Sequence, residues 1–319
     1  MRKLPTILIA ALALLAGAVF AQGSAPVRIV IAFPPGGPVD FVARVLAQGL
    51  GEDLGQSAIV DNRPGANGAI SAQVVAKSAP DGMTLWFTSA GAAVMNPALY
   101  EDLTYDMQRD FTPVSLVVNN VEVLVVNPAN PANSVTDLVA QSRQSPNPIP
   151  IASSGIGSMP HLAMELLADS SGAKLLHVPY KGAAPALTDV MGGQVSGFFG
   201  DIPGLIGFVR GGKLKPIGIA APVRHPLLPD VRTLDEQGIH GVESNNWYAL
   251  FAPAKTPPAR IEQLNAAVRR VLTSETYRKR LLESGADPMP SSPAELAALV
   301  RADTAKWGRI IRDKKIKGE

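Results

Sequence analysis

The segment with the clearest chemical potential is a proline- and glycine-rich loop, FPPGGPVDFVAR, at residues 33–44. It follows the apolar run VRIVIAF and leads into a helical pattern. A glycine turn at a helix N-terminus leaves backbone N–H groups pointing outward at the positive end of the helix dipole, which favours an anion. Gly36 and Gly37 permit close approach because they lack a Cβ atom, and Asp40 can accept backbone N–H bonds that hold the loop. An ordinary strand-to-helix turn explains the same pattern equally well.

A second loop of similar design, SSGIGSMPH, begins at residue 153. Here too an apolar strand ends in serine and glycine before a helix. Two such loops, facing each other across a cleft, could hold one anion from both sides. Serine hydroxyl groups would add donors, and the candidates are Ser153, Ser154, Ser158 and, after an earlier strand, Ser89. For the Ser158 side chain taken alone, capping of its helix is the favoured alternative.

The hydrophobic pattern predicts a framework that can bring these loops together. In the first hundred residues, an apolar strand, a glycine-containing loop and a helix follow one another three times, starting at VRIVIAF, SAIVDN and MTLWFTSAG. A second set of strands follows VEVLVV, namely PIPIASSG, KLLHVPY, QVSGFFG and LKPIGIAA. Continuous apolar strands that alternate with helices predict an α/β protein with parallel sheets covered on both faces.

The C-terminal part favours two lobes. ESNNWYALFAP is predicted to be a strand, whereas the tail from Pro257 is helical and contains almost no strand, so it must pack on an earlier sheet. We expect residues 22–123 and 247–319 to form lobe 1 and residues 124–246 to form lobe 2. The chain should cross between them near residues 121–126 and 244–247. A cleft between two lobes is the default place for a ligand.

The N-terminal segment has the pattern of a secretory signal. Arg2 and Lys3 precede the apolar run from Ile7 to Phe20, small residues follow, and we expect cleavage after Ala21. The apolar run is shorter than the ~20 residues that span a bilayer. The sequence therefore predicts a signal peptide at residues 1–21 and an exported protein.

Charge and residue content exclude several classes of function. Loss of Arg2 and Lys3 with the signal leaves 27 of the 29 basic residues, against 27 acidic ones. A chain near neutrality lacks the basic excess that nucleic acid or an anionic membrane surface requires. With no cysteine, disulfides, a thiolate nucleophile and a lipid-modified N-terminal cysteine are excluded. The four histidines show no metal-binding spacing and no cofactor motif is present, so we expect no metal and no cofactor.

Catalysis is an alternative that the motifs disfavour. No G-x-S-x-G elbow occurs, because GIGSM lacks the closing glycine. Ser158 and His161 lie three residues apart on one predicted helix, a spacing that more often reflects a helix cap and a packed histidine. We therefore expect a binding protein and not an enzyme, with a hydrolase as the remote alternative.

Taken together, the motifs resemble the Bug family of periplasmic solute-binding proteins, the TctC-like receptors of tripartite tricarboxylate transporters. They include PPGGPVDFVAR, VDNRPGANG, ASSGIGSMPHLAMELL and HVPYKGAAPALTDVMGGQV, and the resemblance covers essentially the whole chain after the signal. It implies a type II periplasmic-binding (Venus flytrap) fold that closes around a small organic carboxylate. Two departures stand out: Met107 replaces a usual proline, and Pro38 removes one N–H donor from the first loop.

The resemblance also implies which residues contact the ligand. In the family, two facing loops hold one carboxylate, largely through backbone N–H groups and ordered waters. Tyr180, Lys181, Gly182 and Asp201 correspond to positions near the pocket in the second lobe. The complete candidate set is Phe33, Gly36, Gly37, Val39, Asp40, Ser89, Ser153, Ser154, Gly157, Ser158, Met159, His161, Tyr180, Lys181, Gly182 and Asp201.

The motifs leave alternatives for the distal part of the ligand and for the membrane partner. The apolar side chains of Phe33, Val39 and Met159 suggest an aromatic or aliphatic tail more than a second charge, although plain core packing explains them equally well. The partner is either the permease subunits of a transporter or a membrane sensor that recognises the loaded, closed form. We expect a monomer and no nucleic-acid partner.

Overall fold

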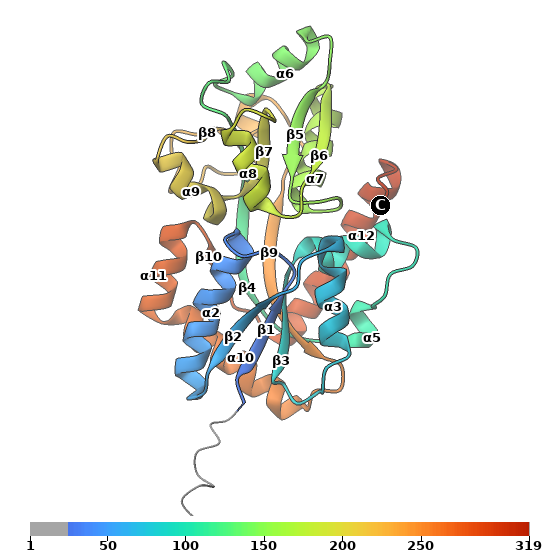
Figure 1. The fold of residues 1–319 in the computed structure, drawn as a ribbon, viewed down its shortest axis with the longest axis vertical. Helices are drawn as coiled ribbons and strands as arrows, with labels where there is room; N and C mark the ends of the chain where they lie inside the picture. The colour runs from blue at the N-terminus through green and yellow to red at the C-terminus, as the bar shows by residue number, and fades with distance from the viewer. Residues whose placement is uncertain (1–24, 319) are drawn as a thin grey trace, which may run out of the picture.

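A computed structural model describes residues 25–318 and shows a mixed α/β protein built on one curled, ten-stranded sheet (Figure 1). The signal peptide predicted at residues 1–21 lies outside the described residues. The strand order is β2-β1-β3-β9-β4-β7-β5-β6, and β8 and β10 also pair with β4. The strands are β1 (Val27–Ile31), β2 (Ala58–Asn62), β3 (Thr84–Ser89), β4 (Phe111–Val126), β5 (Ile149–Ser153), β6 (Leu175–Pro179), β7 (Gly197–Asp201), β8 (Lys215–Ile219), β9 (Asn245–Pro253) and β10 (Asp287–Pro288).

Helices follow most of the strands, as the repeated strand–loop–helix pattern predicts. The α-helices are α2 (Pro38–Leu54), α3 (Ala69–Ala76), α4 (Asn96–Leu99), α5 (Met107–Asp110), α6 (Val135–Gln144), α7 (Met159–Ser171), α8 (Ala183–Met191), α9 (Ile202–Arg210), α10 (Pro258–Thr273), α11 (Glu275–Ser284) and α12 (Pro293–Asp313). Two short 3-10 helices, η2 (Ala66–Gly68) and η4 (Asp235–Gln237), and one π-helix, η3 (Gly91–Met95), complete the described elements. None of the described helices is both long and apolar enough to cross a membrane.

The sheet has two halves that share β4 and β9. Figure 1 shows β1, β2 and β3 in the lower half, β5 to β8 in the upper half, and β4 and β9 between them. Residues of β4 up to Val121 pair with β9, whereas those from Glu122 onward pair with β7 and, from Val123, with β8. This change of partner supports our proposal that lobe 1 comprises residues 22–123 and 247–319, and lobe 2 residues 124–246.

The expectation of parallel pairing holds only for the outer strands. β1 is parallel to β2 and β3, and β5 is parallel to β6 and β7. The shared strands are different, because β4 and β9 are antiparallel to one another and to their other sheet neighbours. One of them carries the chain from the first half to the second and the other carries it back, so they must run in opposite directions.

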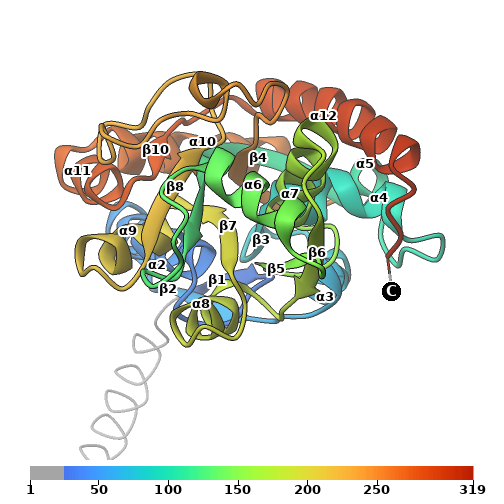
Figure 2. The same ribbon diagram turned by 90° about the horizontal axis from the view of Figure 1, so that it is seen from above.

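Each half of the sheet is covered on both faces by apolar side chains. In the first half, one cluster joins the sheet to α2 and α10, and a second joins it to α3, η3 and α12. In the second half, α6 and α7 cover one face and α8 and α9 the other. Figure 2 shows α10, α11 and α12 along one side of the molecule, so the C-terminal tail packs on an earlier sheet as predicted. Its only strand among the described residues is the two-residue β10.

Candidate ligand-binding site

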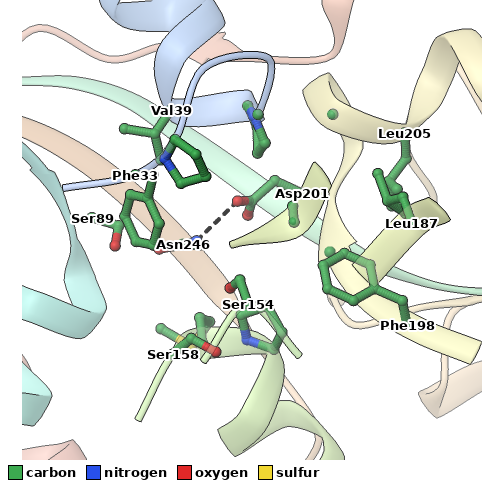
Figure 3. A pocket seen from close by; sticks show the side chains of 18 residues that line it. Phe33, Val39, Ser89, Ser154, Ser158, Leu187, Phe198, Asp201, Leu205 and Asn246 are labelled. Atoms are coloured by element: carbon green, nitrogen blue, oxygen red, sulfur yellow. Dashed lines mark hydrogen bonds between the residues drawn. The ribbon is translucent and has the colours of Figure 1, made fainter. Parts of the chain in front are cut away.

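A cavity lies where the two halves of the sheet meet. Both glycine-containing loops reach it, together with the ends of β3 and β7 and the starts of β9, α8 and α9 (Figure 3). Its wall is formed by Phe33, Pro34, Gly37, Pro38, Val39, Ser89, Ser154, Ser158, Met159, Pro160, Ala183, Leu187, Phe198, Gly200, Asp201, Gly204, Leu205 and Asn246.

The first loop is held from behind by Asp40. Its carboxylate accepts a hydrogen bond from the Gly36 N–H at 3.1 Å, from Arg44 Nε at 2.8 Å and from Asn62 Nδ2 at 2.9 Å. Burial acts to raise the pKa of Asp40, but these hydrogen bonds outweigh it and hold the pKa below its ordinary value. The ionised side chain thus holds the loop, as expected from the sequence, and Gly36 in this turn has a φ of 87°.

The N-terminus of α2 opens toward the cavity. Gly37 caps the helix with extended backbone, and Pro38 occupies its first turn, where the missing N–H costs no helical hydrogen bond. The first hydrogen bond recorded at this end runs from the Phe41 N–H to the Gly37 carbonyl. In the described structure, the N–H groups of Gly37 and Val39 have no recorded acceptor, so they are available to an anion.

The second loop is organised by its serines. Ser158 caps α7 by accepting a hydrogen bond from the His161 N–H, which confirms the capping alternative, and its hydroxyl also donates to the Gly155 carbonyl at 2.7 Å. Ser153 lies behind the loop, with its hydroxyl 2.6 Å from His177 Nε2. No protein partner is recorded for the hydroxyl of Ser154 among the described residues, although this residue lines the cavity.

Two stacked histidines, neither of which lines the cavity, support the second loop. The His161 and His177 rings are parallel, with centroids 3.7 Å apart, and His161 Nδ1 accepts a hydrogen bond from the Gly157 N–H at 3.1 Å. Burial, followed by the proximity of His161, lowers the pKa of His177 to about 4. His177 is therefore neutral at physiological pH.

Close contacts connect the two sides of the cavity. The Asn67 side chain donates to the Gly157 carbonyl at 3.0 Å, joining η2 to the second loop. A Cβ atom added at Gly182 would lie 2.9 Å from Pro34, and one added at Gly204 would lie 2.9 Å from Pro38. Both prolines belong to the first loop, so these contacts leave no room for side chains at the two glycines.

The cavity brings together some of the residues predicted from the sequence and leaves others behind it. Those in its wall are Phe33, Gly37, Val39, Ser89, Ser154, Ser158, Met159 and Asp201. Those that support the loops without lining the wall are Gly36, Asp40, Ser153, Gly157 and His161. Tyr180 donates its hydroxyl to Asp189, Lys181 is exposed, and Gly182 packs against Pro34. None of these three lines the cavity.

Several wall residues were not predicted. Leu187, Phe198 and Leu205 form an apolar side of the cavity, and Figure 3 shows them across Asp201 from Ser89 and Asn246. Their helices and strand have ordinary core patterns, so no local signal marks these positions. Asn246 does carry a signal, because it is a polar residue in a strand expected to cross between lobes.

The wall carries no basic side chain, and Asp201 is its one ionisable residue within the described part of the chain. An anion bound here would consequently be held by backbone N–H groups at two helix N-termini and by serine hydroxyls. Apolar side chains line the wall beside these groups, among them Phe33, Leu187 and Phe198.

Comparison with known proteins identifies the family. The family model described as the tripartite tricarboxylate transporter family receptor, TctC, matches residues 42–316. The chain belongs to this family. TctC proteins are solute-binding receptors, so the expectation of a binding protein agrees with the family, and the resemblance seen in the sequence is confirmed.

Solved structures of similar proteins share the fold over nearly the whole chain. Rpa4515 of R. palustris, solved with adipate, is 33% identical, with a TM-score of 0.89 over 93% of this chain and 99% of that one. MatC from Rhodopseudomonas palustris, solved with malate, is 34% identical, with a TM-score of 0.85 over 90% and 98%. The periplasmic binding protein BugD is 30% identical, with a TM-score of 0.88 over 93% and 100%. The two-lobe periplasmic-binding fold expected from the sequence is thereby confirmed.

Proposed function

We propose that this TctC-family protein is an extracytoplasmic receptor that closes on one small organic carboxylate and delivers it to a tripartite tricarboxylate-type transporter. The observation that carries the proposal is the pairing of two helix N-termini, those of α2 and α7, across a cavity whose wall has no basic side chain. That adipate and malate occupy two similar receptors supports the same ligand class.

The carboxylate would be bound mainly by the main chain. The N–H groups of Gly37 and Val39 on one side, and the hydroxyl of Ser154 on the other, would supply the donors, and no basic side chain lines the wall. Backbone donors fixed by Asp40 and by the histidine pair need no reorganisation when the anion arrives. Since donors come from both lobes, the ligand favours the closed form over the open one.

The apolar side of the cavity would receive the body of the ligand. Leu187, Phe198 and Leu205 offer no partner for a second charge. We therefore place aliphatic or aromatic monocarboxylates first among the candidate ligands. Export through the signal at residues 1–21 would bring the receptor to the periplasm, where it would bind its ligand.

A thermal-shift panel tests this function. The exported protein is unfolded and refolded to remove any bound ligand, and its thermal midpoint is then measured with mono-, di-, tri- and aromatic carboxylates. A ligand at about 100 times its dissociation constant adds about 2.7 kcal/mol, which raises the midpoint of a protein of this size by roughly 5 °C. A selective rise is expected. No rise in correctly refolded protein would contradict the carboxylate assignment.

Delivery to a transporter is tested in cells. Deletion of the gene is expected to abolish uptake of the acid that the panel identifies, and re-expression should restore it. Unchanged uptake, together with loss of a transcriptional response to the same acid, would instead assign the receptor to a membrane sensor.

The Asn67→Ala variant tests whether the contact across the cavity favours closure. Loss of the bond to Gly157 removes about 0.5–1.5 kcal/mol from the closed form, so affinity for the stabilising acid should fall by roughly 2- to 13-fold. Isothermal titration measures the change. Asn265→Ala is the matched control, because Asn265 bonds to the Val114 and Ser291 carbonyls away from the cavity. An equal loss of affinity in both variants would contradict a role for the Asn67–Gly157 bond in closure.

A further inference from the structure

Two buried acids face each other where the two halves of the sheet meet. Glu122 on β4 and Asp201 on β7 are direct partners in the antiparallel ladder, so their side chains leave the same face of the sheet. Glu122 is 0% exposed and Asp201 5% exposed. Asp201 also lines the cavity.

Each acid uses one oxygen and leaves the other without a partner. Glu122 Oε2 accepts from the Ser244 hydroxyl at 2.5 Å, and Asp201 Oδ2 accepts from Asn246 Nδ2 at 2.9 Å. The Tyr248 hydroxyl also donates to Asp201 Oδ2. In the described structure, Glu122 Oε1 and Asp201 Oδ1 are both buried and have no hydrogen-bond partner.

No positive charge compensates the two acids. The elements packed around them contribute only the hydroxyls of Ser244 and Tyr248 and the amide of Asn246, and no ion pair recorded for the described residues includes either acid. Burial raises the pKa of Tyr248 well above its ordinary value, so its hydroxyl remains a neutral donor. Two adjacent buried carboxylates without a cation are strongly disfavoured.

We propose that Glu122 and Asp201 form a proton-binding site in which one proton is held between Glu122 Oε1 and Asp201 Oδ1 at neutral pH. This single proton gives each orphaned oxygen the partner that it lacks. The pair then carries one negative charge in place of two. The site depends only on the chain's own carboxyl groups, so it is independent of the proposed function.

The direction of the pKa shifts agrees with this geometry. Burial raises the pKa of Asp201 to about 7, and burial followed by the charge of Asp201 raises the pKa of Glu122 well above its ordinary value. The native protein therefore retains protons that the unfolded chain releases above about pH 4. Stability contributed by such groups is complete below that pH and is lost as the pH rises through the folded-state values.

Urea unfolding of the ligand-free, exported protein between pH 5 and 8 tests the site. Below about pH 6.5, the lowered pKa values of His177 and His225 oppose this effect, because the unfolded chain binds protons that the native histidines do not. Between about pH 6.5 and 8, the unfolding equilibrium constant should therefore rise about tenfold per pH unit for each proton that the native state retains. Carboxylates with a lowered pKa, such as Asp40, act in the opposite direction and below about pH 4, so they do not mask the effect.

The Glu122→Gln variant supplies an amide N–H in place of the shared proton. Its stability should match that of the wild type near pH 5, exceed it at pH 8, and vary less with pH. Glu262→Gln, at an exposed position of α10, should keep the wild-type pH profile. A constant difference between wild type and Glu122→Gln from pH 5 to 8 would overturn the proposal.

Two further measurements test the proposed proton-binding site even if Glu122→Gln does not fold. Asp201→Asn removes the other acid and should flatten the profile in the same way. In the wild type, the infrared carbonyl band of a protonated carboxylic acid should be present at pH 7 and disappear at higher pH. Absence of that band at pH 7 would show that both acids are ionised and would overturn the proposal without any variant.

Discussion

The Gly37→Val variant is expected to fold normally and to lose measurable affinity for every carboxylate that stabilises the wild-type protein. Gly37 lines the cavity and caps α2, and its backbone is extended, with a φ of −86° and a ψ of 173°, which valine readily adopts. A Cβ atom added there would meet only the Pro34 carbonyl, at 3.9 Å. The new side chain would therefore occupy cavity space and keep the anion away from the N–H donors of the loop.

The measurement combines thermal unfolding with isothermal titration. The midpoint without ligand should stay close to that of the wild type, while the rise on adding the stabilising acid should disappear. Gly207→Val is the matched control, because a Cβ atom at Gly207 meets no atom within 4 Å and the residue does not line the cavity. Retained affinity in Gly37→Val would exclude the first loop as the anion site.

The second large effect is expected from Gly204→Val on α9, which should oppose closure of the lobes. A Cβ atom at Gly204 would lie 2.9 Å from Pro38 Cδ, and Pro38 belongs to the opposing α2. Overpacking of this kind costs about 1–3 kcal/mol. Separation of the lobes relieves the clash, so the cost falls on the closed form. Affinity should drop by roughly 5- to 150-fold, whereas the unfolding free energy without ligand should change little.

Gly207→Val is again the control, since it places the same side chain one helical turn away on α9, in open space. Small-angle scattering with and without the acid reports the lobe separation. The wild type and Gly207→Val should become more compact with ligand, and Gly204→Val should do so only at much higher concentration. Equal affinity in the two variants would show that the Pro38 contact does not limit closure.

The local features of the binding loops could be predicted from the sequence because they depend on near neighbours. Asp40 lies four residues after Gly36, and Ser158 lies three before His161, so both hydrogen bonds follow from spacing in a helical turn. The order of strands and helices was predictable for a similar reason, since each strand is a short apolar run bounded by turn residues. The positions of the two crossing strands were predicted, but their antiparallel pairing was not.

Features that depend on pairing between distant segments could not be predicted. Glu122 lies in VEVLVV, where alternation suggests an outward-facing polar residue, and only its register against Asp201 places the two acids together. Asn67 presented no signal for its bond to Gly157, which is 90 residues away. Leu187 and Leu205 were indistinguishable from core leucines, because the cavity wall and the core use the same side chains.

The proposed grip on the carboxylate through main-chain groups has an evolutionary consequence. Backbone N–H groups do not change when side chains mutate, so the head-group site is inherited intact as long as the glycine turn and its Asp40 support persist. Substitutions at Leu187, Phe198 or Leu205 can then alter which acid is accepted without rebuilding the site that recognises acids in general. Gene duplication followed by a few wall substitutions would be enough to produce receptors for new nutrients.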